Sequence, residues 1–340
     1  MTGLETVAAS VMSELRDSYD RAIGDLRISI TDRCNFRCGY CLPSELVEWK
    51  PKGEILTYEE IVRLTKIFAG LGVRKLRVTG GEPLLRPGVD QLLRRLIAIP
   101  GIEDLALTTN GQLLRRFASA LKAAGLKRLN VSMDSLRGET FFEMTRRNAL
   151  GEVLDGIDAA REAGFERVKI NAVVIRGVND AEIIDFARFG RDHGLTIRFI
   201  EFMPLDAGHR WTKDQVVPGR EIMERIAEVF PLEKITPRHN AETARRYAYR
   251  DGKGELGIIA SVTDPFCGNC NRLRLTADGK LRTCLFALEE HDLLIPMRAG
   301  GSDEDLQELI RAAVLGKQAG HKIGKPDFEQ PARTMSGIGG

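Results

Sequence analysis

Strand-like runs and helix-like segments alternate through the first part of the chain, and this alternation restricts the possible fold more than any other feature. Six short runs rich in β-branched residues span residues 25–30, 75–79, 104–108, 128–132, 168–174 and 196–202. Segments with apolar residues at 3- and 4-residue spacing lie between them, at 58–71, 89–99, 112–124, 150–163 and 181–193. The repeated order predicts parallel strands joined by right-handed helical crossovers.

Small and polar residues follow the predicted strands at their carboxyl ends. The cysteine-rich segment 33–41 follows the first strand, and the segments 80–83, 108–111 and 132–135 follow or end the next three. In a βα barrel the functional groups gather at this rim, whereas a doubly wound sheet has its site at one switch point. We therefore predict an α/β fold, an incomplete (βα)6 TIM-like barrel that is open on one side. A doubly wound sheet is the alternative.

The pattern changes after about residue 205. We expect a helix at 219–229, a charged connector at 236–250, a strand at 256–262, a hairpin formed by 273–276 and 280–283, and a helix at 303–314. The chain thus divides into an N-terminal arm or helix without an assigned function (1–24), a partial barrel (25–205) and a small α+β C-terminal domain (206–340). The C-terminal domain is expected to cover the open side of the barrel.

The first three cysteines, Cys34, Cys38 and Cys41, have the spacing C-x3-C-x2-C. Thiols this close in sequence form strained disulfides at best, but they can converge on one metal centre. A structural zinc site takes four protein ligands, whereas three thiolates on a 4Fe-4S cluster leave one iron open for chemistry. The spacing favours the open cluster. A zinc knuckle with a remote fourth ligand is the alternative.

The other three cysteines, Cys267, Cys270 and Cys284, form a second group. A C-x2-C turn directs two thiolates to one metal, and His291 could complete a Cys3His zinc site. However, the run from Asn271 to Arg274 places two guanidinium groups beside the metal, which a structural zinc site would not need. An odd number of cysteines in each group argues against a disulfide framework and suits a reducing cytoplasm.

Basic residues occur on nearly every predicted strand of the barrel, namely Arg27, Lys75, Arg77, Lys169 and Arg198. Buried cations without partners are costly, so together they require an anion, and a triphosphate supplies several charges at once. The whole chain has 50 Lys and Arg against 48 Asp and Glu, which is too balanced for a protein that coats nucleic acid. We therefore expect a polyanionic small-molecule substrate and no nucleic-acid partner.

The first 25 residues lack the apolar core of a signal peptide, because acidic and basic residues interrupt their short apolar patch. No stretch of the chain approaches the roughly 20 consecutive apolar residues of a membrane span. We therefore expect a soluble, cytoplasmic protein without a membrane partner.

The C-x3-C-x2-C segment resembles the motif of the radical S-adenosylmethionine (SAM) enzymes. Further strings resemble one family among them, the GTP 3′,8-cyclases (MoaA) of molybdenum-cofactor biosynthesis. These strings lie at 25–43, 77–83, 108–111, 169–171, 201–204, 266–274 and 335–340. The resemblance runs from about residue 25 to the end of the chain, except for much of 285–330.

The resemblance implies two 4Fe-4S clusters, one on each cysteine group, and SAM as a cofactor chelated by the open iron of the first cluster. The implied SAM contacts are Tyr40, Gly81, Glu82, Ser132 and Met203, with Glu82 pairing with the SAM ammonium group. The implied GTP contacts are Arg27, Arg77, Thr108, Lys169, Arg272, Leu273 and Arg274. The terminal Gly339 and Gly340 would enter the site and take part in catalysis. Contact of Lys75 and Arg198 with GTP is left open.

The reaction implied by the resemblance begins with one-electron cleavage of SAM into methionine and a 5′-deoxyadenosyl radical. That radical takes hydrogen from C3′ of GTP, and C3′ then bonds to C8 of guanine, which gives 3′,8-cyclo-7,8-dihydro-GTP after reduction. The second cluster would hold the guanine. By pathway, the next enzyme would be cyclic pyranopterin monophosphate synthase, and the chain would be a monomer or homodimer. Alternatives are a radical SAM peptide-modifying maturase and a zinc-stabilised binding module.

Overall fold

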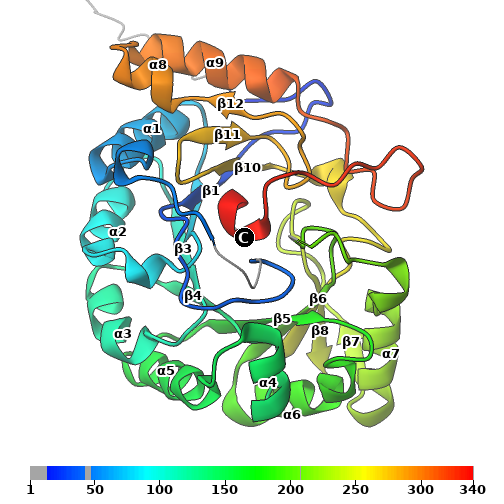
Figure 1. Ribbon diagram of the computed structural model, residues 1–340. Helices are drawn as coiled ribbons and strands as arrows, with labels where there is room; N and C mark the ends of the chain where they lie inside the picture. Colours follow the sequence, from blue (N-terminus) through cyan, green and yellow to red (C-terminus); the bar gives the residue numbers. More distant parts are fainter. Residues whose placement is uncertain (1–13, 43–46, 207, 340) are drawn as a thin grey trace, which may run out of the picture.

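The computed structural model describes residues 14–42, 47–206 and 208–339, and within them one twelve-stranded sheet curves around a central space. Six parallel strands form its middle: β1 (Asp25–Ser29), β2 (Lys75–Thr79), β3 (Asp104–Thr109), β4 (Arg128–Ser132), β5 (Val168–Val174) and β6 (Thr196–Glu201). Their helices lie outside the ring (Figure 1). They are α1 (Tyr58–Gly70), α2 (Val89–Ile97), α3 (Leu114–Ala123), α5 (Leu150–Glu162) and α6 (Ile183–His193).

The C-terminal part extends both edges of this sheet. On one side, β10 (Arg272–Leu275) pairs in parallel with β1, and β11 (Lys280–Arg282) and β12 (His291–Asp292) follow it. On the other side, β9 (Glu255–Ile259) pairs in parallel with β6, followed by β8 (Arg245–Tyr249) and β7 (Leu232–Lys234). The outermost strands do not pair with each other in the described sheet order. The predicted α/β fold with an open, partial barrel is therefore confirmed.

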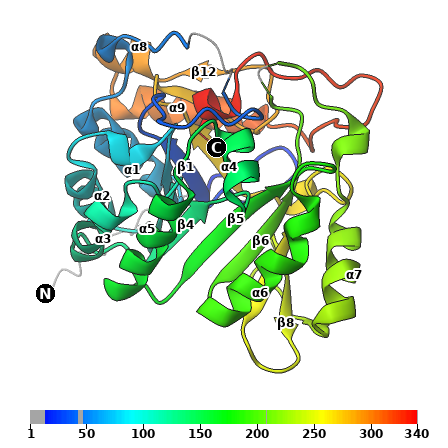
Figure 2. The same ribbon diagram turned by 60° about the horizontal axis from the view of Figure 1, so that its bottom comes forward.

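The remaining helices of the C-terminal part are α7 (Gly219–Val229), α8 (Leu294–Arg298), α9 (Asp303–Leu315) and α10 (Met335–Ile338). Figure 2 shows α6 and α7 beside each other, and both contact β6 and β9. The short α10 ends the described chain inside the ring of strands (Figure 1). The hairpin and the helices that we expected at 219–229 and 303–314 are present.

One local expectation needs correction, one helix was not predicted, and the expected N-terminal arm or helix is an arm over its described residues. The connector at 236–250 contains β8, which pairs antiparallel with β9 although its sequence is highly charged. An additional helix, α4 (Gly138–Thr145), precedes α5. Residues 14–24 form an arm with a bridge between Arg16 and Ala22 and are not helical, whereas 1–13 lie outside the described residues.

The two faces of the central strands differ in chemistry. Alternate residues such as Leu26 and Ile28 point outward into the core beneath the helices and are fully buried. The intervening positions, for example Arg27 and Arg77 on paired strands, face the enclosed space. Parallel strands usually read as continuous apolar runs because both of their faces are covered by apolar residues. Here the alternation reserves the inner face for polar and charged groups.

No helix in the described ranges combines the length and the apolar character that crossing a bilayer would require.

Glu201 at the end of β6 joins three segments at the rim. Its carboxylate accepts hydrogen bonds from the backbone N–H groups of Gly219 at 2.7 Å, Val262 at 2.7 Å and Thr263 at 2.8 Å. The side-chain hydroxyl of Thr263 also donates to it. Glu201 is fully buried, so these bonds replace its lost hydration. The carboxylate therefore fixes the start of α7 and the segment that leads to the second cysteine group.

We predict that Glu201→Gln lowers the free energy of unfolding by about 3 kcal/mol, because an amide NH2 would face buried donors and leave them unpaired. The matched control is Glu221→Gln, which breaks a surface ion pair with Arg176 and should cost below about 1 kcal/mol. Urea denaturation of both variants measures the difference. Equal losses in the two variants would contradict the central role given to Glu201.

Candidate active site

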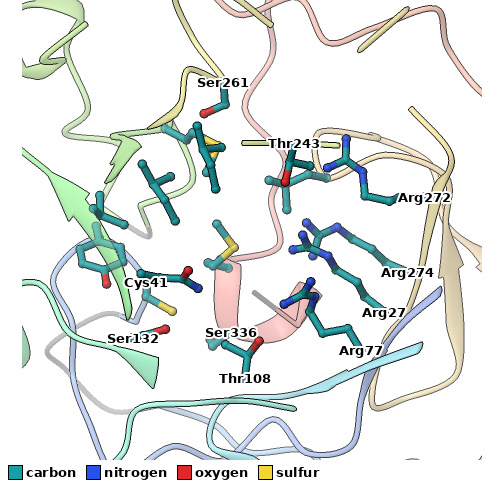
Figure 3. Close-up of a pocket in the computed structure, with 18 of the residues that line it drawn as sticks. Arg27, Cys41, Arg77, Thr108, Ser132, Thr243, Ser261, Arg272, Arg274 and Ser336 are labelled. Atoms are coloured by element: carbon teal, nitrogen blue, oxygen red, sulfur yellow. The ribbon is translucent and has the colours of Figure 1, made fainter. Parts of the chain in front are cut away.

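A cavity of about 290 Å³ occupies the space inside the ring of strands. It is lined by residues from the carboxyl ends of the central strands, from β10 and from the C-terminal tail (Figure 3). Many of the residues singled out from the sequence line it: Arg27, Cys34, Cys38, Tyr40, Cys41, Arg77, Gly81, Thr108, Ser132, Arg198, Met203, Cys267, Cys270, Arg272, Arg274 and Cys284. One cavity thus brings both cysteine groups and most of the strand arginines together.

The first cysteine group lies in the loop after β1. The backbone N–H groups of Cys41 and Leu42 both donate to the Cys38 carbonyl at 2.9 Å, so a tight turn sets the relative positions of the last two thiols. Burial raises the pKa of Cys34 to about 11 and that of Cys41 to about 12, and for Cys41 the nearby Cys34 adds to the effect. The thiolate forms that bind metal are therefore disfavoured until a cation shares the site.

The second cysteine group lies where a 3-10 turn at Cys267–Asn269 meets β10 and β11. Burial raises the pKa of Cys270, but the positive charges of Arg272 and Lys317 outweigh it and lower this pKa to about 7. The Arg272 guanidinium also donates to the Cys270 sulfur at 3.4 Å. His291 lies on β12 and does not line the cavity, whereas His321 does. A Cys3His zinc site with His291 therefore has no support from this geometry.

The donor chemistry of the two cysteine groups fits a 4Fe-4S cluster. Within the ranges that the structure describes, no three His, Cys, Asp or Glu side chains form a group that could hold one ion. A 4Fe-4S cluster attaches each thiolate to a different iron, so its ligands are spread farther apart than those of one zinc ion. Three soft sulfur donors in each group are the donor set that such a cluster uses.

Five arginines line the cavity, namely Arg27, Arg77, Arg198, Arg272 and Arg274. None of the five has an acidic partner within 4 Å among the described residues, and the Nε atoms of Arg27, Arg77 and Arg198 are buried without a hydrogen-bond partner. Burial lowers the pKa of Arg27, and the nearby Arg274 and Arg77 lower it further. Burial likewise lowers the pKa of Arg198 to about 9 and that of Arg274 to about 10.

The arginine side chains converge from one wall of the cavity. Figure 3 shows Arg27, Arg77, Arg272 and Arg274 pointing from β1, β2 and β10 toward the side that carries Cys41 and Ser132. Unpaired buried cations in such a group repel one another and have lost their hydration, so this wall favours a bound polyanion.

Four residues predicted from the sequence do not line the cavity as described: Glu82, Lys169, Leu273 and Gly339. Leu273 is buried in the core because it points to the opposite face of β10 from its arginine neighbours. Lys169 lies on β5, where burial and the charge of Arg198 lower its pKa to about 8. Gly340 lies outside the described residues. Lys75 does not line the cavity either.

Glu82 is fully buried and fully engaged within the protein. Its carboxylate accepts hydrogen bonds from the Leu84 N–H at 2.9 Å, the Thr109 hydroxyl at 2.8 Å and the Asn110 N–H at 2.7 Å. Burial raises its pKa to about 7. Glu82 therefore joins the loop after β2 to the end of β3, and a ligand would share a carboxylate that already accepts three hydrogen bonds.

The C-terminal tail reaches the cavity through α10, whose Met335 and Ser336 line it. Gly339 follows with a φ of 84°, and its carbonyl accepts a hydrogen bond from Arg274 at 2.8 Å. A β-carbon at Gly339 would lie 2.7 Å from Cβ of Ser29 and 3.0 Å from Oγ1 of Thr79. The tail therefore fits between the ends of β1 and β2 only because this residue is glycine.

Asp134 and Thr243 are among the polar lining residues that were not named as candidates. Asp134 accepts a hydrogen bond from the Tyr40 hydroxyl at 2.5 Å and another from the Val173 N–H, and burial raises its pKa to about 6. Its position two residues after Ser132 at a strand end was an available signal. Thr243 also lines the cavity, but it belongs to the charged connector and no motif marks it.

Two family models match the chain in succession. The Radical SAM superfamily matches residues 28–190, and Molybdenum Cofactor Synthesis C matches residues 195–323. Among solved structures, Streptococcus suis SuiB bound to the precursor peptide SuiA has a TM-score of 0.62, covering 92% of this chain and 76% of that one. At 15% identity this likeness shows a shared fold.

Curated relatives are far more similar. The GTP 3′,8-cyclase of Rhodopirellula baltica is 48% identical over 330 residues, covering 96% of this chain and 92% of that protein. The GTP 3′,8-cyclase of Streptomyces coelicolor is 47% identical and covers 96% of both chains. The mitochondrial GTP 3′,8-cyclase of Arabidopsis thaliana is 44% identical, covering 97% of this chain and 84% of that one. The chain belongs to the GTP 3′,8-cyclase family of radical SAM enzymes.

Proposed function

We propose that this protein converts GTP into 3′,8-cyclo-7,8-dihydro-GTP in a radical SAM reaction. Family membership gives the reaction class. The observation that carries the substrate is the set of five cavity arginines without acidic partners in the described chain, four from β1, β2 and β10 and one, Arg198, from β6. A nucleoside triphosphate neutralises several of these charges at once. Charge-assisted hydrogen bonds of this kind contribute roughly 1.5–3 kcal/mol each.

The first cysteine group would hold the 4Fe-4S cluster that binds SAM. When bound, the cluster and SAM together supply the electron transfer and the 5′-deoxyadenosyl radical that begin the reaction. Tyr40, Ser132 and Met203 line the cavity around Cys38 and are proposed to orient SAM. Gly81 also allows the cysteine loop to pack closely against the loop after β2. A β-carbon at Gly81 would lie 2.3 Å from the Arg33 carbonyl oxygen and would push the cysteine loop away.

The second cysteine group is proposed to hold a second 4Fe-4S cluster that receives the guanine. Arg272 and Arg274 on β10 lie beside it, and with Arg27 and Arg77 they are proposed to bind the triphosphate. Thr108 would contact the nucleotide from β3, and Arg198 joins this set because its guanidinium also lines the cavity. Lys169 would contact the triphosphate only from a deeper position on β5. These assignments place the ribose between the two cysteine groups.

The chain's own contribution to the reaction is to hold the two ligands together and keep water away from them. The tail residues Met335 and Ser336 close one side of the cavity, and Gly339 is anchored by Arg274. Enclosure of this kind protects reactive species from side reactions. By the pathway named in the matched C-terminal family, the proposed consumer of the product is cyclic pyranopterin monophosphate synthase.

Anaerobic incubation of the iron-loaded protein with SAM, a reductant and GTP tests this function. We expect 5′-deoxyadenosine and a rearranged purine nucleotide in equal amounts, identified by chromatography and mass spectrometry. A peptide-modifying maturase would yield no rearranged purine. A zinc-stabilised binding module would be colourless and contain zinc instead of iron and sulfide.

We predict that the two cysteine groups separate SAM cleavage from cyclisation. Cys34→Ser should abolish formation of 5′-deoxyadenosine, because the first cluster would lose one of only three ligands. Cys270→Ser should retain some uncoupled SAM cleavage and lose the cyclised product. Quantifying both products for each variant makes the comparison. Unchanged product formation by Cys270→Ser would assign the second group to structure, and full cleavage by Cys34→Ser would remove the first cluster from the proposal.

We predict that Arg27→Met has opposite effects on stability and on substrate binding. Removing a buried cation without an acidic partner should raise the thermal unfolding midpoint of the nucleotide-free protein. The same change should weaken GTP binding by about tenfold or more, since at least one charge-assisted hydrogen bond is lost. Arg63→Met is the control, because Arg63 forms a surface ion pair with Asp303. Undiminished GTP affinity in Arg27→Met would contradict the triphosphate assignment.

We predict that Gly339→Ala reduces turnover by about a hundredfold, because the added carbon clashes with Ser29 and shifts the tail out of the site. Gly300→Ala is a matched control: Gly300 also has a positive φ, 91°, but an added carbon there meets nothing within 4 Å. This control should lose about 1–2 kcal/mol of stability and keep its turnover. Full turnover in Gly339→Ala would show that the tail does not contribute to the reaction.

A further inference from the structure

The N-terminal arm, residues 14–24, reaches the second cysteine group through a single side chain. The Nη1 atom of Arg21 donates to the carbonyl of Cys267 at 2.8 Å and to that of Ala319 at 2.7 Å. Its Nη2 atom donates to the Gln318 carbonyl at 2.6 Å. Arg21 is only 8% exposed, so its guanidinium forms a buried link between the carbonyls of Gln318 and Ala319 and that of Cys267, which also accepts the Cys270 N–H at 3.0 Å.

Arg21 is itself held in place by its neighbours in the arm. Its Nε atom donates to the Asp17 carboxylate at 2.7 Å, and the Asp17 side chain is completely buried. The other oxygen of Asp17 accepts the backbone N–H groups of Tyr19 and Arg21, and the Tyr19 ring lies 5.0 Å from the guanidinium. The buried pair thus presents a fixed guanidinium fork and not a mobile surface charge.

The carbonyls of Gln318 and Ala319 belong to a segment, residues 317–321, that covers the second cysteine group. Gly320 lies so close to Cys267 that an added β-carbon would be 2.9 Å from its Cβ and 3.3 Å from its sulfur. Burial raises the pKa of Cys267, and a backbone hydrogen bond from His321 to its sulfur offsets this only in part. The Lys317 ammonium donates to the carbonyls of Arg272 and Thr283. This covering segment therefore contacts the loops that carry all three thiols.

We infer that Arg21, oriented by Asp17, is a positioning residue for the second cysteine group. It fastens the Cys267 loop to the covering segment. Loss of the fork would remove the hydrogen bonds that join the two and would leave the buried Asp17 carboxylate without its partner, so the Cys267 loop and the covering segment would separate. Outer hydrogen-bond partners of metal ligands have this role in other metal sites, and their loss typically weakens metal binding by about 10- to 100-fold.

This inference deepens the proposed function, because it rests on the second cluster assigned to Cys267, Cys270 and Cys284. The positioning role of Arg21 concerns the second cysteine group and not the first. The first cysteine group lies in a loop that is packed against Thr145 and Met144 by backbone hydrogen bonds, and Arg21 makes no contact with it. A general loss of stability would affect both groups, whereas loss of a positioning contact should affect only the second.

The test compares Arg21→Gln, Arg21→Lys and the double variant Asp17→Asn with Arg21→Gln, which removes the unpaired Asp17 charge. Arg16→Gln is the matched control, because Arg16 lies in the same arm and pairs with Glu14 and Asp20 while remaining exposed. All four are made in the full-length chain and in a background with Cys34, Cys38 and Cys41 replaced by serine. In that background, bound iron reports the second group alone.

In the serine background, we expect Arg21→Gln and the double variant to lose iron to a chelator at about tenfold lower concentration than the unchanged chain or Arg16→Gln. In metal-free full-length protein, alkylation of Cys267 should become about tenfold faster while alkylation of Cys34 stays unchanged, as measured by mass spectrometry. Arg21→Lys should restore part of both properties, since it keeps the charge and its three N–H donors lie on a single nitrogen that cannot reproduce the planar fork. In the iron-loaded protein, SAM cleavage should persist while cyclisation falls.

Two results would overturn the inference. In the first, Arg21→Gln matches Arg16→Gln in iron retention and in Cys267 alkylation. In the second, all six cysteines become equally reactive, which would make Arg21 a general stability contact. If the unchanged chain holds no iron at the second group, the proposed function fails at that point. The alkylation of Cys267 in metal-free protein then still decides whether Arg21 positions its loop.

Discussion

Positive charge enclosed within the barrel is the constraint on which the rest of the structure depends. Arg27 and Arg77 on adjacent strands, with Arg274 on the added strand β10, face one cavity without acidic partners in the described chain. A protein that buries cations in this way sacrifices stability in the absence of its ligand. Such an arrangement is retained when a polyanion completes it. The inner face of the sheet is therefore a ligand-binding surface and not part of the apolar core.

The partial barrel explains why two cysteine groups that are far apart in the sequence line one cavity. Loops at the carboxyl ends of parallel strands converge on one rim, and the first cysteine group follows β1 at that rim. Because β10 pairs in parallel with β1, with Arg272 beside Asp25, the second cysteine group lies at the opposite ends of these strands from the first group. One cavity spans the space between the two groups. Extension of the sheet edge thus has the same effect as closing the barrel: it places a second set of ligands opposite the first.

The sequence allowed the parallel strands, the partial barrel, the two cysteine groups and the arginines of the cavity to be predicted, because periodicity and motifs are local properties. It failed where long-range contacts decide. The strand β8 was read as a charged connector, since only its pairing with β9 makes that pattern a strand. The contact of Glu82 with SAM stays a prediction, but its three hydrogen bonds within the protein could not be predicted, because no local pattern connects it to the residues near 84 and 109 that donate them. Arg21 had no motif at all.

Arg274 is the point where the tail, the anion-binding wall and the second cysteine group come together. Its guanidinium donates to the Gly339 carbonyl and lines the cavity next to Arg272, which contacts the Cys270 sulfur. A guanidinium has five N–H donors in a rigid fork, so it can bind a carbonyl and a phosphate together, provided that both lie in its plane. The position of the tail and the position of a bound triphosphate are therefore coupled through one side chain. Such coupling gives a physical reason for a chain terminus to be folded into the middle of a barrel.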